Sequence, residues 1–474
     1  MGYALLVSAL FMFISALISV ADGDSAMAPL LISCIITFTV GIFPFIFVRK
    51  TDAITLKDGY LIIVLSWLLS FLFGMLPYAL WGGPFTLENA WFESVSGYTT
   101  TGATILGDIE ALPRSLLFWR SSTHFIGGLG VVVFLLLILP NTSPIRLRLT
   151  NMELSSLSRG GYNSRTNKTV YIFAYVYLAL TASAFVCYML AGMSPFDAIN
   201  HAFSVCAAGG FSTKNLSIAG FQAPLIEGIT MLFMIRATTH FGLLYLVFIT
   251  RSFKPLGNPV FKFYIGALVL FSVFLGISLM TNGLCPNVGS AFWNGAFQVI
   301  SIASTTGFAT MDNSIWPMSA NIFLMLMAVM CGCAGSTTGG IKSDRVLVLF
   351  KSIGRQIERI MHPSAVSGIR LGDTVLKGEE VAPHVLYITL YFLLFAVSVL
   401  LTTAFGVAPH CALAGSLCSL SNVGPAIAEI GLFGNFDCIP LAGKLIFTFD
   451  MFLGRVEIYP VLAVVTMVFS KKSN

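Results

Sequence analysis

The segment Thr99-Thr100-Thr101-Gly102-Ala103-Thr104 decides the expected fold, because three similar segments follow it along the chain. They are Ala207-Ala208-Gly209-Gly210-Phe211-Ser212, Ser304-Thr305-Thr306-Gly307-Phe308-Ala309 and Ser421-Asn422-Val423-Gly424-Pro425-Ala426. The glycines at their fourth positions are 108, 97 and 117 residues apart. Small residues precede each glycine by six and by twelve positions: Ser96, Ser204, Ser301 and Cys418, and then Ala90, Ala198, Gly295 and Ala412. This shared register indicates a fourfold internal repeat.

The composition places the chain in a membrane. Of its 474 residues, 56% are hydrophobic and 10% are charged, and the mean hydropathy is +0.87. An ordinary soluble domain has about 25% charged residues, so a soluble protein is excluded. A membrane-spanning helix needs about 20 mostly apolar residues. Ten stretches meet this requirement: 3–21, 28–48, 59–81, 115–140, 169–192, 223–250, 262–282, 320–350, 383–406 and 440–470.

Four further stretches lead up to the aligned glycines and are too short to span: 87–102, 196–210, 291–307 and 411–424. Irregular backbone at membrane depth is tolerated only inside protein or around a water-filled path, which predicts re-entrant segments. We therefore expect an all-α integral membrane protein with about ten transmembrane helices. Two N-terminal helices precede four pseudo-symmetric helix–re-entrant pore helix–helix repeats around one pore. The expected units are 1–50, 51–150, 151–256, 257–375 and 376–474.

Basic residues predict the orientation. Five regions on one side of the ten-helix arrangement hold 20 of the 26 Lys and Arg residues: 49–57, 146–168, 251–262, 342–377 and 471–472. Because cytoplasmic loops are enriched in Lys and Arg, both termini are expected in the cytoplasm. The short stretches then enter from outside, where Glu93, Asp108 and Glu110 are among the acidic residues. These carboxylates either concentrate cations or are ordinary solvated loop charges. No basic block with interleaved aromatic residues suggests nucleic acid.

The four glycine segments suit cation conduction. A pore must replace the water shell of an ion with oxygen atoms, and backbone carbonyl groups can do so. Glycine allows the backbone conformations that turn carbonyl groups inward. Each short helix would also direct its partially negative C-terminal end at the pore. The alternative, close helix packing at the glycines, does not explain the short segment before each one. The candidate ion-binding residues are Thr100, Thr101, Gly102, Ala208, Gly209, Gly210, Thr305, Thr306, Gly307, Asn422, Val423 and Gly424.

A second glycine-rich region interrupts the apolar stretch 320–350. Residues 332–340 contain four glycines together with Ser336, Thr337 and Thr338. Glycine is a poor helix former, so we expect a flexible intramembrane loop, or alternatively a kinked packing face. Arg455 lies in an apolar helix near Asp450 and Glu457. Such an arginine is usually functional, although a structural ion pair with a neighbouring carboxylate is the alternative.

Two polar pairs on apolar helices are expected to brace the bundle rather than bind ions. Arg120-xxx-His124-Phe125 recurs as Arg236-xxx-His240-Phe241, one copy in each of the first two repeats. Lys214 follows the second glycine segment, and the sequence does not indicate its effect on ions. No catalytic, metal-helix or phosphate-loop motif suggests an enzyme.

Over nearly the whole length, these residues resemble the Trk/Ktr/HKT superfamily of potassium transporters, and the bacterial Trk-type pore subunits most closely. The most specific signatures are Thr99-Thr100-Thr101-Gly102, Ser421-Asn422-Val423-Gly424-Pro425, Cys333-Ala334-Gly335-Ser336-Thr337-Thr338-Gly339-Gly340-Ile341-Lys342 and Gly454-Arg455-Val456-Glu457. The two helices ahead of four repeats also match the bacterial pattern.

The resemblance implies potassium uptake across the bacterial cytoplasmic membrane, with the four glycines as selectivity filter. Family members with serine at the first filter position tend toward sodium, so Gly102 favours potassium. The implied gate is an intramembrane loop below the filter, with Arg455 as a positive barrier beside it; the loop residues are Gly335, Ser336, Thr337, Thr338, Gly339 and Gly340. The resemblance also implies a homodimer and a cytosolic nucleotide-binding ring subunit, for which 342–377 is a candidate docking surface. Potassium is the substrate, and no covalently bound cofactor is expected.

Two other functions stay open on the sequence alone. A secondary transporter would couple potassium to sodium or protons through a titratable residue in the path, with Asp450 or Glu457 as candidates. A non-transporting scaffold or membrane enzyme would tolerate substitution of the filter glycines without a change in ion flux.

Overall fold

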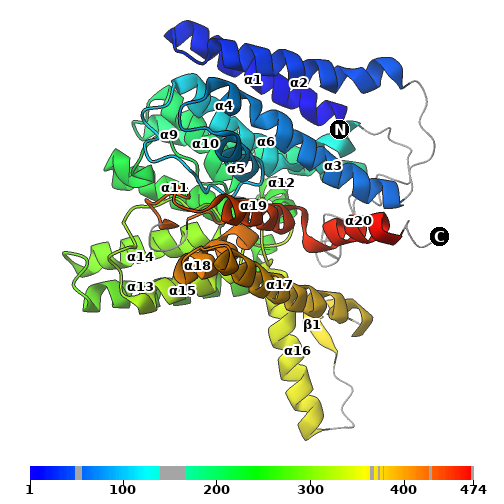
Figure 1. Cartoon of the computed structure of the whole chain (residues 1–474). Coiled ribbons are helices and arrows are strands. Elements are labelled where there is room, and N and C mark those ends of the chain that lie inside the picture. The colour runs from blue at the N-terminus through cyan, green and yellow to red at the C-terminus, as the bar shows by residue number, and fades with distance from the viewer. Residues whose placement is uncertain are drawn as a thin grey trace.

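The computed structural model describes residues 1–48, 56–138, 166–362, 368–371, 374–376, 378–425 and 430–470. Helices make up most of these residues, as the sequence predicts, and most of them pack in one bundle, from which α16 (Ser343–Met361) projects (Figure 1). The strands in the described ranges, β1 (Ile369–Leu371) and β2 (Thr374–Leu376), form one short antiparallel hairpin. The predicted boundaries at 50/51 and 150/151 lie outside the described residues.

The first two helices form a hairpin at the edge of the bundle. Helix α1 (Gly2–Asp22) and helix α2 (Met27–Phe47) are joined by a tight turn, in which Asp24 Oδ1 accepts a hydrogen bond from the Ala26 nitrogen at 3.0 Å. Much of the outward surface of α2 is apolar and exposed, including Ile35 and Phe47. That surface is the kind that a bilayer covers.

Within the described residues, six helices are long and apolar enough to cross a membrane, or seven if one bent pair counts as a single span. They include α1, α2 and four outer helices of the later units. The outer helices are α3 (Leu56–Gly74) with its continuation α4 (Leu76–Trp81), α9 (Thr166–Leu190), α13 (Pro259–Thr281) and α17 (Gly378–Ala404). The chain is therefore a multi-span membrane protein, while the count of ten spans stays a prediction.

Each of the four stretches predicted to be too short to span contains a short helix. These are α5 (Leu87–Tyr98), α10 (Pro195–Ala207), α14 (Val288–Ala303) and α18 (Pro409–Ser421). Their starts follow from local sequence, because Thr86, Ser194 and Asn287 cap three of them with side-chain oxygens. Proline occupies the first position of α10 and α18, where its missing N–H group has no cost.

The helix that follows each short helix is broken, in the apolar stretches predicted at 115–140, 223–250, 320–350 and 440–470. Helix α6 (Arg114–Ile138) is non-helical at Gly130, and α11 (Pro224–Thr238) meets α12 (Phe241–Thr250) at 104°. Helix α15 (Met318–Val329) is separated by a loop from α16 (Ser343–Met361), and α19 (Leu441–Val456) from α20 (Ile458–Ser470) by Glu457 at φ 66°.

Two of the broken helices, α6 and α19, pack closely against the ends of short helices. A Cβ atom on Gly127 would collide with the carbonyl group of Tyr98, and one on Gly454 with that of Leu420. Two short 3₁₀ helices, η1 (Ser217–Phe221) and η2 (Lys254–Gly257), complete the described elements.

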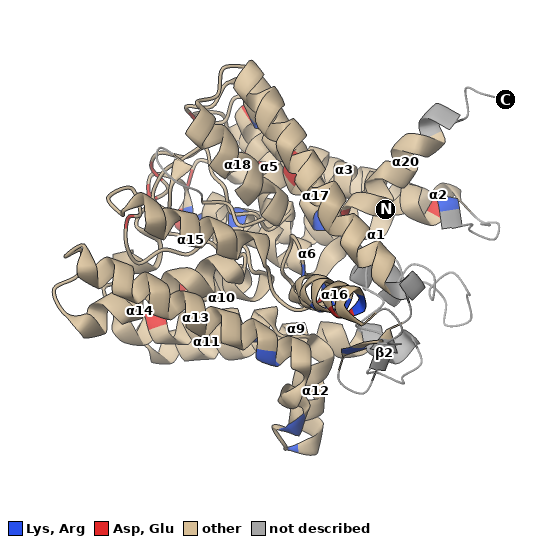
Figure 2. Cartoon of the chain, turned by 90° about the horizontal axis from the view of Figure 1, so that it is seen from below, with Lys and Arg blue, Asp and Glu red and all other residues tan. Residues whose placement is uncertain are grey.

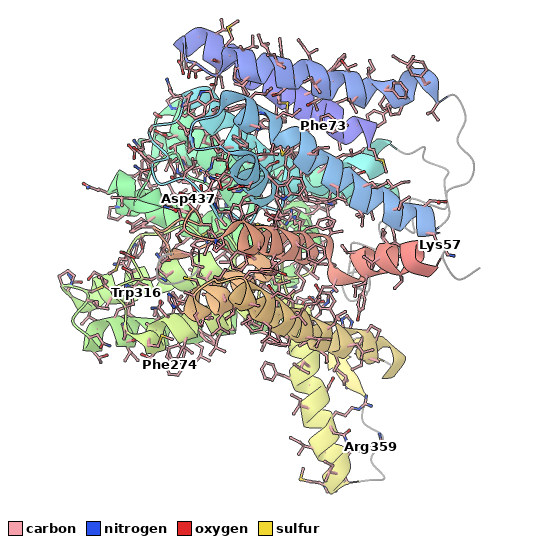
Figure 3. All side chains as sticks on the ribbon, in the orientation of Figure 1. Lys57, Phe73, Phe274, Trp316, Arg359 and Asp437 are labelled. Carbon is pink, nitrogen blue, oxygen red and sulfur yellow. The ribbon has the colours of Figure 1, made fainter. Side chains whose placement is uncertain are left out.

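Charged residues are sparse on the ribbon and gather near helix ends and along α16 (Figure 2). Lys57 and Asp437 lie toward opposite ends of the bundle, and Arg359 lies far out on α16 (Figure 3). Most of the predicted basic regions 49–57 and 146–168, and both lysines of 471–472, lie outside the described residues. The orientation of the termini therefore stays a prediction.

Candidate functional site

The four glycine segments share one backbone conformation. Each short helix ends at a non-glycine residue in the left-handed region: Thr100, Ala208, Thr305 and Asn422, with φ of 55°, 59°, 56° and 55°. The aligned glycine follows two residues later, and Gly102, Gly210, Gly307 and Gly424 have φ of 81°, 80°, 76° and 83°. Non-glycine residues in this region are strained, and such strain tends to occur at functional sites.

One backbone hydrogen bond closes each turn, and its acceptor is the residue six positions before the glycine. The N–H group just before the glycine donates to the carbonyl of that residue: Thr101 to Ser96 at 2.9 Å, Gly209 to Ser204 at 2.9 Å, Thr306 to Ser301 at 3.0 Å and Val423 to Cys418 at 2.9 Å. This is a Schellman-type helix end. In the first and third segments the serine hydroxyl also donates to the carbonyl just after the glycine, on Ala103 and on Phe308, at 2.6 Å each.

The four turns close into a ring. A Cβ atom on each glycine would come closer than 3.0 Å to a carbonyl oxygen of the next segment. The pairs are Gly102 with Gly209, Gly210 with Thr306, Gly307 with Val423, and Gly424 with Thr101. The last pair returns to the first segment. Glycine is therefore required here for two independent reasons, the positive φ and the close approach of a neighbouring carbonyl group.

Three of the four segments also have a side-chain oxygen two residues before the aligned glycine. The buried Thr100 Oγ1, Thr305 Oγ1 and Asn422 Oδ1 have no hydrogen-bond partner among the described residues. Ala208 takes the equivalent position in the second segment and has no polar side chain. An unpaired buried oxygen is costly unless it finds a partner. The arrangement is thus asymmetric, as the sequence indicates.

A cavity of about 170 Å³ lies against one side of the ring. Residues of the ring and those that follow the glycines line it, among them Gly102, Gly210, Gly307, Ser212 and Pro425. The glycine-rich loop lies on the other side, because it contacts residues that precede the glycines. Thr337 Oγ1 donates to the Cys206 carbonyl at 3.0 Å, for example. An ion passing through the ring would move between this cavity and that loop.

A buried ion pair braces the first two segments. Arg120 Nε lies 2.6 Å from Glu93 Oε1, and the two side chains are 2% and 0% exposed. The carboxylate of Glu93 also accepts hydrogen bonds from Thr104 Oγ1 and from the Ile105 nitrogen. The guanidinium group lies 3.5 Å from the centroid of the Phe211 ring. The sequence suggested that Glu93 either concentrates cations or is a solvated loop charge, and both suggestions are wrong because its side chain is fully buried.

The two Arg-xxx-His motifs are not equivalent. The bracing prediction is confirmed for Arg120 and for His124, whose ring stacks on Phe211 at 4.0 Å. Arg236 is exposed in the last turn of α11, so the same prediction is wrong for it. His240 caps α12 through its Nδ1 atom, which accepts from the Gly242 nitrogen at 2.9 Å.

The glycine-rich loop is a folded structure between α15 and α16. Its two ends pair, with the Cys331 nitrogen donating to the Ile341 carbonyl at 2.9 Å. The Phe241 nitrogen donates to the Gly335 carbonyl at 3.1 Å, and Ser336 Oγ lies 2.9 Å from Thr338 Oγ1. Gly339 packs against the Asn422 side chain, and Gly340 against Cys331 and Ser421. The predicted interruption of the helix is therefore confirmed.

Arg455 joins this loop to another broken helix. Its Nη1 donates to the Thr337 carbonyl at 2.6 Å, and its Nη2 to the Gly127 carbonyl at 2.5 Å. Of the two carboxylates considered as partners, Glu457 pairs with Arg345 at 2.8 Å. The other, Asp450, accepts a hydrogen bond from the Ser398 hydroxyl.

Comparison with known proteins identifies the family. Residues 29–474 match the family model TrkH, described as cation transport protein. The chain belongs to the TrkH family. The Trk system potassium uptake protein TrkH of Salmonella typhimurium is 33% identical over 424 residues, which cover 89% of this chain and 87% of that protein. Its namesake in Halomonas elongata is 32% identical over 481 residues, or 100% and 98% of the two chains.

Solved structures agree with this family. The crystal structure of the potassium transporter TrkH from Vibrio parahaemolyticus superposes with a TM-score of 0.88 at 31% sequence identity, covering 99% of this chain and 97% of that one. The resemblance inferred from the sequence is thus confirmed. The chain is a cation transport protein rather than an enzyme, because the TrkH family consists of ion transporters.

Proposed function

We propose that this TrkH-family chain takes up potassium across the bacterial cytoplasmic membrane, through the centre of the ring formed by Gly102, Gly210, Gly307 and Gly424. The closure of the ring carries the proposal, since each glycine lies against a carbonyl group of the next segment. Carbonyl groups that four segments place around one centre can replace the water shell of a monovalent cation. The names of the relatives, potassium uptake proteins, support potassium as the substrate.

In this proposal the chain has ten spans and four pore repeats, 51–150, 151–256, 257–375 and 376–474, behind the two helices of 1–50. The filter consists of the twelve residues predicted from the sequence: Thr100, Thr101, Gly102, Ala208, Gly209, Gly210, Thr305, Thr306, Gly307, Asn422, Val423 and Gly424. Both termini lie in the cytoplasm, so the cavity above the ring faces outward. The unpaired oxygens of Thr100, Thr305 and Asn422 support a cation site at the inner end.

The loop around 335–340 is the gate in this scheme. It lies on the cytoplasmic side of the ring and is held by Arg455 through the Thr337 carbonyl. A positive charge at this depth opposes a passing cation, so the arginine acts both as a latch and as an electrostatic barrier. We further propose a homodimer with one pore per protomer, and a separate cytosolic nucleotide-binding ring that moves the loop by way of 342–377.

The test is uptake of rubidium and sodium into proteoliposomes that contain the full chain, with and without Gly102→Ser. A serine Cβ would strike the Gly209 carbonyl, so the variant should lose most of its preference for rubidium. Gly82→Ser is the matched control, because Gly82 has φ 79° but open space around it. Equal rubidium and sodium uptake by the folded wild-type protein, or an identical preference in Gly102→Ser, would reject the filter.

A further inference from the structure

The cavity above the ring contains a feature that is unexpected on a cation path. Among the described residues that line it, the charged ones are Arg120 and Lys214, and both are positive. Arg120 is neutralised by its buried pair with Glu93 at 2.6 Å. Lys214 is 3.8 Å from Glu110, and these side chains are 36% and 47% exposed. A pair so open to solvent is weak, and it leaves the ammonium group at the mouth of the cavity.

The backbone on both sides of Lys214 is fixed. The Lys214 nitrogen donates to Ser212 Oγ at 3.0 Å, and its carbonyl accepts from the Ser217 nitrogen at 3.1 Å. Its Cβ atom packs against Gly220, where an added Cβ would lie 3.2 Å away. The lysine stem is thus held at this position, while its ammonium group is partly exposed to solvent.

Asn215 holds the neighbouring loop in place. Its Nδ2 donates to Asp108 Oδ1 at 2.8 Å, and its Oδ1 accepts from the Ile109 nitrogen at 2.6 Å. Its own backbone nitrogen donates to Glu110 Oε1 at 3.2 Å. The loop after the first glycine segment and the loop after the second are thereby joined. Glu110 therefore approaches the lysine from the opposing loop, and Asp108 is held beside it by the side chain of Asn215.

We propose that Lys214 discriminates against divalent cations at the outer mouth of the pore. The electrostatic energy of an ion near a fixed charge is proportional to the charge of the ion. If the ammonium group lowers the occupancy of a monovalent ion by about threefold, it lowers that of a divalent ion by the square, about tenfold. The nearby Asp108 and Glu110 attract both kinds of cation, and the divalent ion more strongly. Lys214 therefore offsets a preference for divalent cations that these carboxylates would otherwise create. This inference rests on the proposed function, because it takes the cavity as the outer end of the path.

The test measures rubidium uptake by the full chain in proteoliposomes at low ionic strength, with external barium as the inhibitor. Lys214→Gln should lower the half-saturating rubidium concentration by about threefold and the half-inhibiting barium concentration by about tenfold. Glu110→Gln should raise both concentrations. Each shift should shrink when an impermeant salt raises the ionic strength toward 0.5 M, because the Debye length falls from about 10 Å at 0.1 M to about 3 Å at 1 M.

Two control variants test whether the effect depends on the charge of residue 214 and on its position beside the cavity. Lys214→Arg keeps the charge and should behave as wild type. Arg114→Gln removes a cation that pairs with Asp22 at 3.5 Å and does not line the cavity, so barium inhibition should be unchanged. Unchanged barium inhibition in Lys214→Gln, equal shifts for rubidium and barium, or a matching shift in Lys214→Arg would overturn the inference. In each of these three outcomes the wild-type protein still takes up rubidium. Failure of the proposed function would be seen instead as absent rubidium uptake by the wild-type protein.

Discussion

Asn422 Nδ2 lies 3.0 Å from Thr101 Oγ1, and this hydrogen bond joins the last glycine segment to the first. The same nitrogen donates to the Met451 carbonyl on α19 at 2.8 Å. Its oxygen has no partner among the described residues and lies beside Gly339 of the intramembrane loop. One amide group therefore contacts the ring, a broken helix and the loop, which places it where the proposed filter and the proposed gate meet.

Replacing this amide should loosen the ring. Asn422→Ala removes two buried hydrogen bonds, each of which typically contributes about 1 kcal/mol to stability. We expect the rubidium-to-sodium uptake ratio to fall severalfold while total uptake persists. Asn258→Ala removes the N-cap of α13, far from the ring in sequence, and should leave the ratio unchanged. An unaltered ratio in Asn422→Ala would mean that backbone contacts alone hold the ring closed.

The pair between Arg120 and Glu93 should be essential for folding. Breaking one partner of a buried pair costs about 3–5 kcal/mol, because a charge is left uncompensated. Thermal unfolding in detergent should show a large loss of stability for Arg120→Gln and a smaller additional loss for Arg120→Gln/Glu93→Gln. Arg114→Gln breaks an exposed pair and should cost less than about 1 kcal/mol. Strictly additive losses in the double variant would contradict direct coupling of the two residues.

Removing the arginine latch should increase uptake. Arg455→Gln eliminates the charge and weakens the bonds to the Thr337 and Gly127 carbonyl groups. We expect rubidium uptake to rise severalfold without a matching change in the rubidium-to-sodium ratio, because these two bonds go to the loop and to α6 rather than to the glycine segments. Arg345→Gln, which breaks the pair with Glu457 and leaves Arg455 in place, is the comparison. Lower uptake in Arg455→Gln with normal folding would argue against a barrier.

Asp450 tests whether transport is coupled. Its carboxylate is buried and accepts a hydrogen bond from Ser398, a residue of the outer helix α17. We expect an imposed pH gradient to drive no rubidium accumulation in wild type or in Asp450→Asn, with downhill uptake similar in both. Accumulation against a gradient in wild type that disappears in Asp450→Asn would establish a proton-coupled transporter in place of a passive pore.

Much of the candidate site was predictable because it is encoded locally. The short helices follow from Ser, Thr, Asn and Pro at their starts and from apolar runs too short to span. The break in 320–350 follows from glycine in the middle of an apolar helix, and Gly335 and Gly340 do adopt positive φ. The burial of Glu93 was not predictable, since the sequence around a glutamate is the same whether its side chain faces solvent or a buried arginine.

Composition and spacing alone determined the membrane class, the four short helices and the four glycines, since these depend on hydrophobicity and on residues close together in the chain. Only the tertiary structure decided the order in which the segments close the ring, the breaks at Gly130 and Glu457, and the partners of Arg120, Arg455 and Asn422. These features depend on contacts between residues that are often a hundred or more positions apart. Such contacts form only when the helices pack, because the space available to a carbonyl group or a guanidinium is set by its neighbours.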